Sequence, residues 1–98
     1  MRTATVAQLA DLSQAILTSA GANRESAEAA TWAMLHASLH GVDSHGIRLL
    51  PFYADCLRSG LAKGSPDIKV THPRRAAALV DADNGMGHIA MYRAMDEA

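Results

Sequence analysis

The sequence predicts an α+β protein, in which three helices are followed by a strand-strand-helix unit. Up to about residue 60, apolar residues recur at steps of three and four, the period of one helical face. After the turn-rich stretch AKGSPD, apolar and polar residues alternate over short segments, as they do in half-buried strands. We therefore expect a helical domain over residues 1–62 and the start of a second domain over residues 63–98.

The first helix is expected over residues 5–20. Its predicted apolar face consists of Val6, Leu9, Leu12 and Ile16. Gly21 is predicted to end this helix, because glycine adopts the left-handed backbone that follows many helices.

The second helix is predicted to begin after Asn23, whose side chain can cap the first free amides. Glu25 suits the positive end of the helix dipole. The apolar residues fall on two neighbouring faces, so we expect this helix to be covered on two sides: Ala27, Ala30, Met34 and Ala37 on one, and Trp32, Leu35 and Leu39 on the other. Gly41 is predicted to end it.

Residues 41–46 are expected to form a loop, followed by a third helix from Ile47 or Arg48 to Ser59. Pro51 fits the first turn of this helix, where no amide donor is missed. The predicted buried face is Leu50, Tyr53 and Leu57, and Gly60 is predicted to end the helix.

The segments IKVTH and AAALVDA, joined by PRR, are predicted to pair as strands. The turn DADNGMGH follows, and a fourth helix is expected from about Gly87. That helical pattern is still running at Ala98 without a stop signal. We therefore expect the chain to be the front part of a longer protein.

Composition excludes several classes of protein. Of the 98 residues, 49% are hydrophobic and 4% aromatic, and the formal net charge is −1. This balance does not predict the basic face of a nucleic-acid-binding protein. Cys56 is the only cysteine, so no internal disulfide can form. There is no apolar signal at the N-terminus and no segment long enough to span a bilayer. These features predict a cytoplasmic protein.

The stretch from Asp43 to Gly46 carries the strongest candidate site, with Asp, Ser and His side by side. A histidine can donate or accept a proton near neutral pH, so His45 is a candidate general acid or base. Ser44 can hydrogen-bond a substrate oxygen, and Asp43 can orient the imidazole. Arg48 can hold a carboxylate. The alternative is a plain turn, in which Asp43 and Ser44 cap the third helix and His45 lies at the surface.

His36 and His40 stand four residues apart, a spacing that can bind zinc. No adjacent glutamate stands where a zinc protease needs one, and Cys56 is the only thiol. A structural histidine pair is therefore the favoured interpretation. Cys56 itself is expected to be a core residue.

The turn DNGMGH begins a helix with two glycines. Free amides at a helix start can bind phosphate. The spacing is not that of a dinucleotide-binding GxGxxG motif, and a glycine-rich helix cap explains it as well.

The segment HGVDSHGIRLLPFYADCLRSG resembles the signature of the type 2 malate/L-lactate dehydrogenase family. These are NAD(P)-dependent oxidoreductases that act on 2-oxo acids and related 2-imino acids. Two other blocks resemble the same family in the same order: TVAQLADLSQAILTSAGANRESAEAATWAMLHASLHG and AAALVDADNGMGHIAMYRAMDEA. The resemblance covers essentially the whole chain.

The resemblance implies a helical N-terminal domain followed by a non-Rossmann nucleotide-binding domain, in a homodimer with its active site between domains. It implies that His45 is the catalytic acid/base, that Ser44 is its substrate-contacting neighbour, and that the cofactor is NAD or NADP. Some members carry the carboxylate-binding arginine four residues after the histidine. That position is Leu49 here, and Arg48 precedes it. Family members are much longer, so most of the cofactor site is expected beyond Ala98, and the 98 residues alone are expected to turn over little substrate.

A second interpretation is a small helical binding or oligomerisation module without catalysis. It is suggested by the short chain and by the predicted two-sided second helix.

Overall fold

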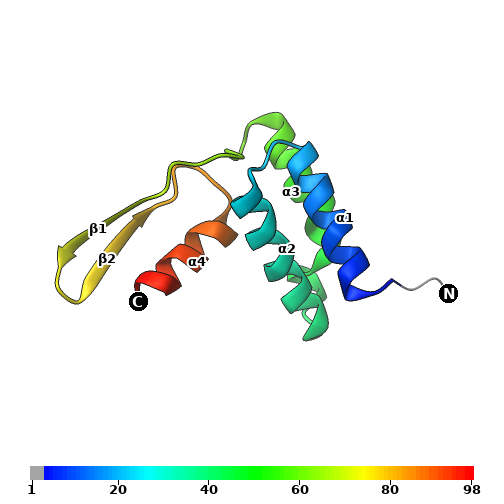
Figure 1. The fold of residues 1–98 in the computed structure, drawn as a ribbon, viewed down its shortest axis with the longest axis horizontal. Coiled ribbons are helices and arrows are strands. Elements are labelled where there is room, and N and C mark those ends of the chain that lie inside the picture. Colours follow the sequence, from blue (N-terminus) through cyan, green and yellow to red (C-terminus); the bar gives the residue numbers. More distant parts are fainter. Residues whose placement is uncertain (1–3) are drawn as a thin grey trace.

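The computed structural model describes residues 4–98, which form four α-helices and one two-stranded antiparallel sheet. Two short 3-10 turns, η1 and η2, connect the second and third helices (Figure 1). The elements are α1 (Val6–Ser19), α2 (Arg24–Leu39), η1 (Asp43–His45), η2 (Ile47–Leu49), α3 (Leu50–Ser59), β1 (Lys69–Arg74), β2 (Ala77–Asp81) and α4 (Gly87–Glu97). The predicted α+β class and the order of its elements are confirmed.

The helix ends follow the local signals. Asn23 caps α2 by accepting a hydrogen bond of 2.9 Å from the Ser26 amide, and Glu25 lies in the first turn. Gly21, Gly41 and Gly60 have φ values of +117°, +76° and +82°, a region where glycine is at little disadvantage. Thr5 additionally forms a capping box with Gln8 at the start of α1.

The core lies between α1, α2 and α3. Its buried residues include Leu17 of α1, Ala30 and Met34 of α2, and Leu50 and Ala54 of α3. The alanines among these residues let the helices approach closely, and the leucines and Met34 fill the space between them, so a chain with few aromatic residues still builds a packed core.

Two predicted faces need correction. In α1 the fully buried residues are Ala10, Ser13 and Leu17, whereas Val6 and Leu12 are exposed. The true buried stripe runs through small residues that a hydrophobicity pattern underweights. In α2 the predicted face through Ala27 and Met34 is buried, and so is Leu35 of the neighbouring face. Trp32 and Leu39 of that second face are 50% and 65% exposed, so this face is only partly buried. The helix α2 is nevertheless packed against two others, α1 and α4.

The third helix also begins later than predicted. Ile47–Leu49 form a 3-10 turn, and α3 starts at Leu50 with Pro51 in its first turn. Leu50 and Leu57 are buried and Tyr53 is half-buried, which confirms the predicted face. Cys56 is half-buried rather than fully inside the core.

The strands form a hairpin that projects from the helices (Figure 1). Val70 pairs with Val80 and Lys69 with Asp81, and the register shifts between Thr71 and Arg74. The strand β1 extends past the predicted segment to Arg74, and Leu79 is 63% exposed. A two-stranded sheet is marginal alone in water, so the contact of β2 with α4 supports it.

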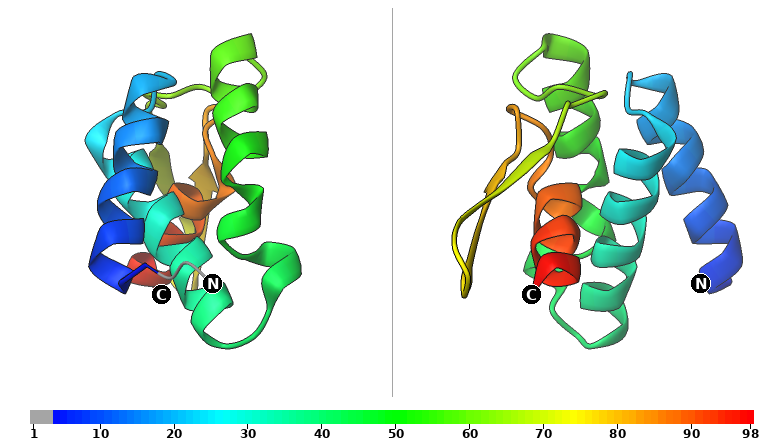
Figure 2. Two further views of the ribbon diagram at one scale, coloured as in Figure 1. Left: turned by 90° about the vertical axis from the view of Figure 1, so that its right-hand side faces the viewer. Right: turned by 60° about the vertical axis from the view of Figure 1, so that its left-hand side comes forward.

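The helix α4 packs between the hairpin and α2 (Figure 2). Ile89 is buried, and Met86 just before the helix belongs to the same core as Leu17 and Met34. Arg93 forms an ion pair of 3.2 Å with Glu25 at the start of α2. The two predicted domains, 1–62 and 63–98, therefore share one core in the described residues, residues 1–3 lying outside them. The boundary itself stays a prediction.

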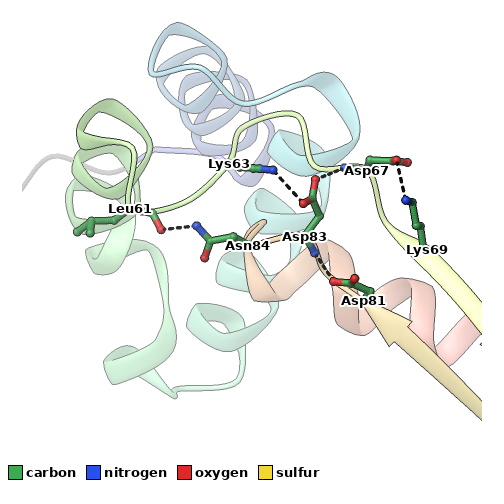
Figure 3. Close-up of polar contacts among 7 residues, drawn as sticks. All are labelled: Leu61, Lys63, Asp67, Lys69, Asp81, Asp83 and Asn84. Carbon is green, nitrogen blue, oxygen red and sulfur yellow. Dashed lines mark hydrogen bonds and ion pairs between the residues drawn. The ribbon is translucent and has the colours of Figure 1, made fainter.

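Polar contacts fasten the connector after α3 to the turn before α4 (Figure 3). The Asp83 carboxylate accepts hydrogen bonds of 2.9 Å from both Lys63 Nζ and the Asp67 amide. The Asn84 side-chain amide donates to the Leu61 carbonyl at 3.1 Å. The backbone carbonyl of Asn84 accepts a hydrogen bond of 2.8 Å from the Lys63 amide. The hydrogen bond from the Asp67 amide lowers the pKa of the Asp83 carboxyl most, and the hydrogen bond from Lys63 lowers this pKa further. These hydrogen bonds hold the connector, residues 61–67, against the turn that contains Asp83 and Asn84.

The helices of the described residues contain no span long and apolar enough to cross a membrane.

Candidate active site

The loop that carries Ser44 and His45 is built from short turns. Gly41 leaves α2 with a left-handed backbone, and the Val42 amide bonds back to the Ala37 carbonyl at 2.8 Å. The amides of His45 and Gly46 then bond to the carbonyls of Val42 and Asp43, which closes the 3-10 turn. Nearly all of this loop is exposed, but its backbone conformation is well determined by these bonds.

Ser38 of α2 supports the loop from below. Its hydroxyl oxygen accepts a hydrogen bond of 2.9 Å from the Ile47 amide. Gly46 lies directly against it: a Cβ at Gly46 would overlap Ser38 Oγ and come within 3.3 Å of Ser38 Cα. Gly46 has a φ of −93°, so its need for glycine comes from close packing and not from a left-handed backbone. The glycine after the histidine therefore admits a neighbouring helix.

The His45 side chain makes one hydrogen bond in the described chain. Its Nδ1 lies 2.9 Å from Ser44 Oγ, and both side chains are exposed. When the Ser44 hydroxyl donates to Nδ1, the neutral ring carries its proton on Nε2; when Nδ1 donates to Ser44 Oγ, Nε2 becomes the free base. Ser44 can thus select the tautomer, and Nε2 has no hydrogen-bond partner within the described residues.

The other two predicted site residues, Asp43 and Arg48, lie close to His45 in the sequence but form no hydrogen bond with its imidazole ring. Asp43 and Arg48 are exposed, and neither forms an ion pair within residues 4–98. Asp43 therefore does not orient the imidazole here, because Ser44 takes that place. Nor does a side chain of Asp43 or Ser44 cap the third helix, since the support for the Ile47 amide comes from Ser38.

Replacing Ser38 by alanine tests this support. We expect Ser38→Ala to destabilise the fold by about 1 kcal/mol, because the half-buried Ile47 amide loses its partner. Chemical unfolding would measure the loss, and amide exchange should rise first at Ile47. Ser59→Ala is a suitable control, since Ser59 donates only to the exposed carbonyl of Cys56. Equal effects of the two changes would contradict a specific role for Ser38.

The two histidines of α2 do not form a metal site in the described residues. Their rings stack with centroids 4.2 Å apart, and His40 Nδ1 lies 2.8 Å from the His36 carbonyl oxygen. No group of three or more His, Cys, Asp or Glu side chains within residues 4–98 is placed to hold a metal ion. The pair is better explained as a structural end to α2.

The glycine-bearing turn before α4 brings His88 against α3. The rings of His88 and Tyr53 lie perpendicular, with centroids 4.7 Å apart. A mostly apolar cavity of about 400 Å³ opens beside them, lined by Ala33, Tyr53, Gly87, His88, Met91, Tyr92 and Met95. The sequence patterns predicted neither the contact between His88 and Tyr53 nor the support that Ser38 gives to the loop. The turn DNGMGH was a signal for the first; nothing in the sequence marks a serine inside a helix as a loop support.

The chain belongs to the malate/L-lactate dehydrogenase family, whose sequence profile matches residues 4–98. Among curated relatives, it is 36% identical to the L-sulfolactate dehydrogenase of Methanothermobacter thermautotrophicus over 85% of this chain and 24% of that protein. The chain spans about a quarter of the length of the curated relatives it matches.

Solved structures show the same likeness in three dimensions. The malate dehydrogenase of Pyrococcus horikoshii superposes with a TM-score of 0.89 at 32% identity, over 97% of this chain and 27% of that one. The Δ1-piperideine-2-carboxylate reductase of Pseudomonas syringae gives a TM-score of 0.90 at 31% identity, over 99% of this chain and 29% of that one.

Proposed function

We propose that the chain is the N-terminal part of an NAD(P)-dependent oxidoreductase that transfers a hydride between a nicotinamide and a 2-hydroxy or 2-oxo acid. Membership of the malate/L-lactate dehydrogenase family supports the reaction class. The observation that carries the site assignment is the exposed Ser44–His45 pair, held at 2.9 Å on a loop with a fixed backbone. The cofactor is a nicotinamide, either NAD or NADP.

His45 has the chemistry that such a reaction needs. When hydride reaches the C2 carbon of a 2-oxo acid, negative charge develops on the C2 oxygen, and a positioned acid must supply a proton. His45 Nε2 has no hydrogen-bond partner within residues 4–98, so it is free to meet that oxygen. In the reverse direction the same nitrogen takes the proton from the hydroxyl group. In the acid form both ring nitrogens carry a proton, and Nδ1–H donates to Ser44 Oγ. After Nε2 has given up its proton, the neutral ring keeps the Nδ1 proton, and Nε2 is the base for the reverse direction.

Arg48 is the group we propose to bind the substrate carboxylate. It is exposed on η2, three residues after His45, and has no ion pair in the described chain. A guanidinium can hold a carboxylate by two parallel hydrogen bonds and so fix the position of C2.

The names of the similar proteins support a substrate with a carboxylate group. The names of the similar proteins cover malate, L-sulfolactate and the cyclic imine Δ1-piperideine-2-carboxylate. All three carry a carboxylate next to the reacting carbon, which is the feature Arg48 would recognise. A homodimer is part of the same proposal. The apolar side chains of Met91, Tyr92 and Met95 on α4 support it, because they form an exposed apolar surface that a second subunit could cover.

The test of the carboxylate site is Arg48→Leu in the full-length polypeptide that carries this chain. We expect KM for a 2-oxo acid to rise about tenfold to a hundredfold, because a charge-assisted bond to the carboxylate contributes about 1.5–3 kcal/mol. Initial rates of nicotinamide oxidation with both NADH and NADPH would measure it. Arg58→Leu, which removes an exposed partner of Asp55 on α3, is the matched control. An unchanged KM would exclude Arg48 from the substrate site, and it would not affect the proposed role of His45.

A further inference from the structure

We propose that His88 is a proton-sensitive latch between α3 and α4: its neutral ring holds the start of α4 against α3, and protonation of the ring releases that end of α4 from α3. The proposal concerns the fold itself and goes beyond the enzymatic function proposed above.

The contact has the geometry of a packing element. His88 is half-buried on the first turn of α4 and meets the Tyr53 ring of α3 edge to face, with 4.7 Å between centroids. Such perpendicular aromatic contacts stabilise beyond their buried area. Cavities of about 400 Å³ and 190 Å³ flank His88, and the main packing contacts of α4 are with α2 and β2 and not with α3.

The ring has no partner for a second proton. His88 Nδ1 is shut off from solvent and accepts or donates no hydrogen bond. A neutral ring with its proton on Nε2 leaves only a lone pair unsatisfied there. Protonation would bury both a charge and an unpaired N–H donor, which is far more costly.

The surroundings supply no countercharge. The titratable groups among the residues that line the two cavities are Tyr53 and Cys56 of α3 and Tyr92 of α4, and none of these lining residues is acidic or basic apart from His88. Most charged groups of the packed elements are engaged in these pairs: Glu25 with Arg93, Glu28 with Arg24, Asp55 with Arg58, Asp83 with Lys63, and Glu97 with His72. Asp96 of α4 is in none of them, but it lies eight residues along the helix from His88, about 12 Å by the helical rise. The imidazolium would therefore lack the compensation that a neighbouring carboxylate gives.

Burial accordingly lowers the pKa of His88 below the ordinary value of 6.5. The sign of the pH dependence follows. Above about pH 6.5 both the latched and the released ring are neutral, and the latch is at full strength. As the pH falls below that value, the released ring binds a proton that the latched ring refuses, so release becomes more favourable.

Release of this end of α4 would change the packing beneath the loop that carries His45. Met86, directly before α4, belongs to the core against which Ile47 packs at the end of that loop. The latch thus connects the pH of the medium to the packing beneath the candidate active site.

Amide exchange in the 98-residue chain, followed by NMR across the acidic range, tests the latch. Corrected for intrinsic exchange, protection of the α4 amides should fall by up to tenfold per pH unit below about pH 6.5, while protection of α1 changes less. In His88→Phe, which keeps a ring but cannot bind a proton, this acid-induced loss should disappear. His88→Gln serves the same purpose if the phenylalanine variant fails to fold.

His36→Gln is the matched control, because that ring is exposed on α2. It should leave the acid-induced loss in place. The proposal is overturned if His88→Phe and His88→Gln lose α4 protection as the parent chain does, or if α1 and α4 lose protection in parallel, since the proton would then act on the whole fold. None of these outcomes depends on enzymatic activity, so failure of the latch and failure of the proposed function are distinguishable.

Discussion

Replacing His45 by glutamine in the full-length polypeptide is expected to lower turnover by about 10²–10⁴-fold, the usual contribution of a positioned acid or base. Glutamine can still hydrogen-bond Ser44, so the loop should keep its shape, but it cannot transfer a proton. The loss should fall on kcat, with KM for the acid little changed, because the missing group acts as charge develops in the transition state. Steady-state rates in both directions, with reduced and oxidised nicotinamide, would measure it.

His40→Gln provides the control for this experiment. His40 is also exposed and lies five residues before His45, at the end of α2. The His40→Gln substitution should reduce turnover little. If His45→Gln folds normally and retains full turnover, His45 is not the acid/base, and the interpretation of the chain as a non-catalytic helical module gains support.

Replacing Gly64 by alanine is expected to be among the most destabilising single changes in the chain. A Cβ at this position would overlap the carbonyl oxygen of Gly21 and come within 3.0 Å of the Ala22 amide nitrogen. The Gly64 carbonyl also accepts a hydrogen bond of 2.7 Å from the Asn23 amide. The clash is with backbone atoms, which cannot rotate away, so the connector must leave its place against the start of α2.

We expect Gly64→Ala to lower the free energy of unfolding by about 1–3 kcal/mol or more, the usual range for overpacking. In a chain of this size each 1 kcal/mol lowers the melting temperature by about 4–8 °C. Thermal unfolding followed by circular dichroism would measure the change. The loss should include the contacts of Lys63 and Asp67 with Asp83, because these residues flank Gly64 in the connector.

Gly87→Ala is the matched control, since it adds the same methyl group at a glycine with no atom within 4 Å of the new Cβ. Gly87 begins α4, and alanine there should be neutral or raise stability by about 0.4–1 kcal/mol, since it restricts the unfolded chain. Similar losses at the two glycines would show that the chain tolerates no added methyl groups, and that the contact with Gly21 is not special.

Local signals were sufficient for most of the secondary structure. Asn23 and the glycines at 21, 41 and 60 act on backbone groups within a few residues, so their effect can be inferred without knowing the fold. The change from helical to strand period identified the hairpin for the same reason. The register shift and the extra length of β1 depend on how the two strands meet, and were missed.

Burial was predicted less well. Periodicity placed Val6 and Leu12 inside, but α1 turns Ala10 and Ser13 toward the core. Which stripe is buried depends on the shape of the neighbouring helix, and close approach of α1 to α2 favours small side chains. The exposure of Trp32 likewise follows from what packs beside α2.

The sequence by itself determined the order of helices and strands, the family, and the two candidate site residues, His45 as the proposed acid/base and Ser44 as its neighbour. These follow from spacing, from capping residues and from the order of three sequence blocks. Only the tertiary structure decided that Ser44 meets the imidazole, that Ser38 and Gly46 hold the loop, and that His88 packs on Tyr53. Each of these contacts depends on the relative placement of segments that local propensity does not set, because that placement follows from how the helices and turns pack together.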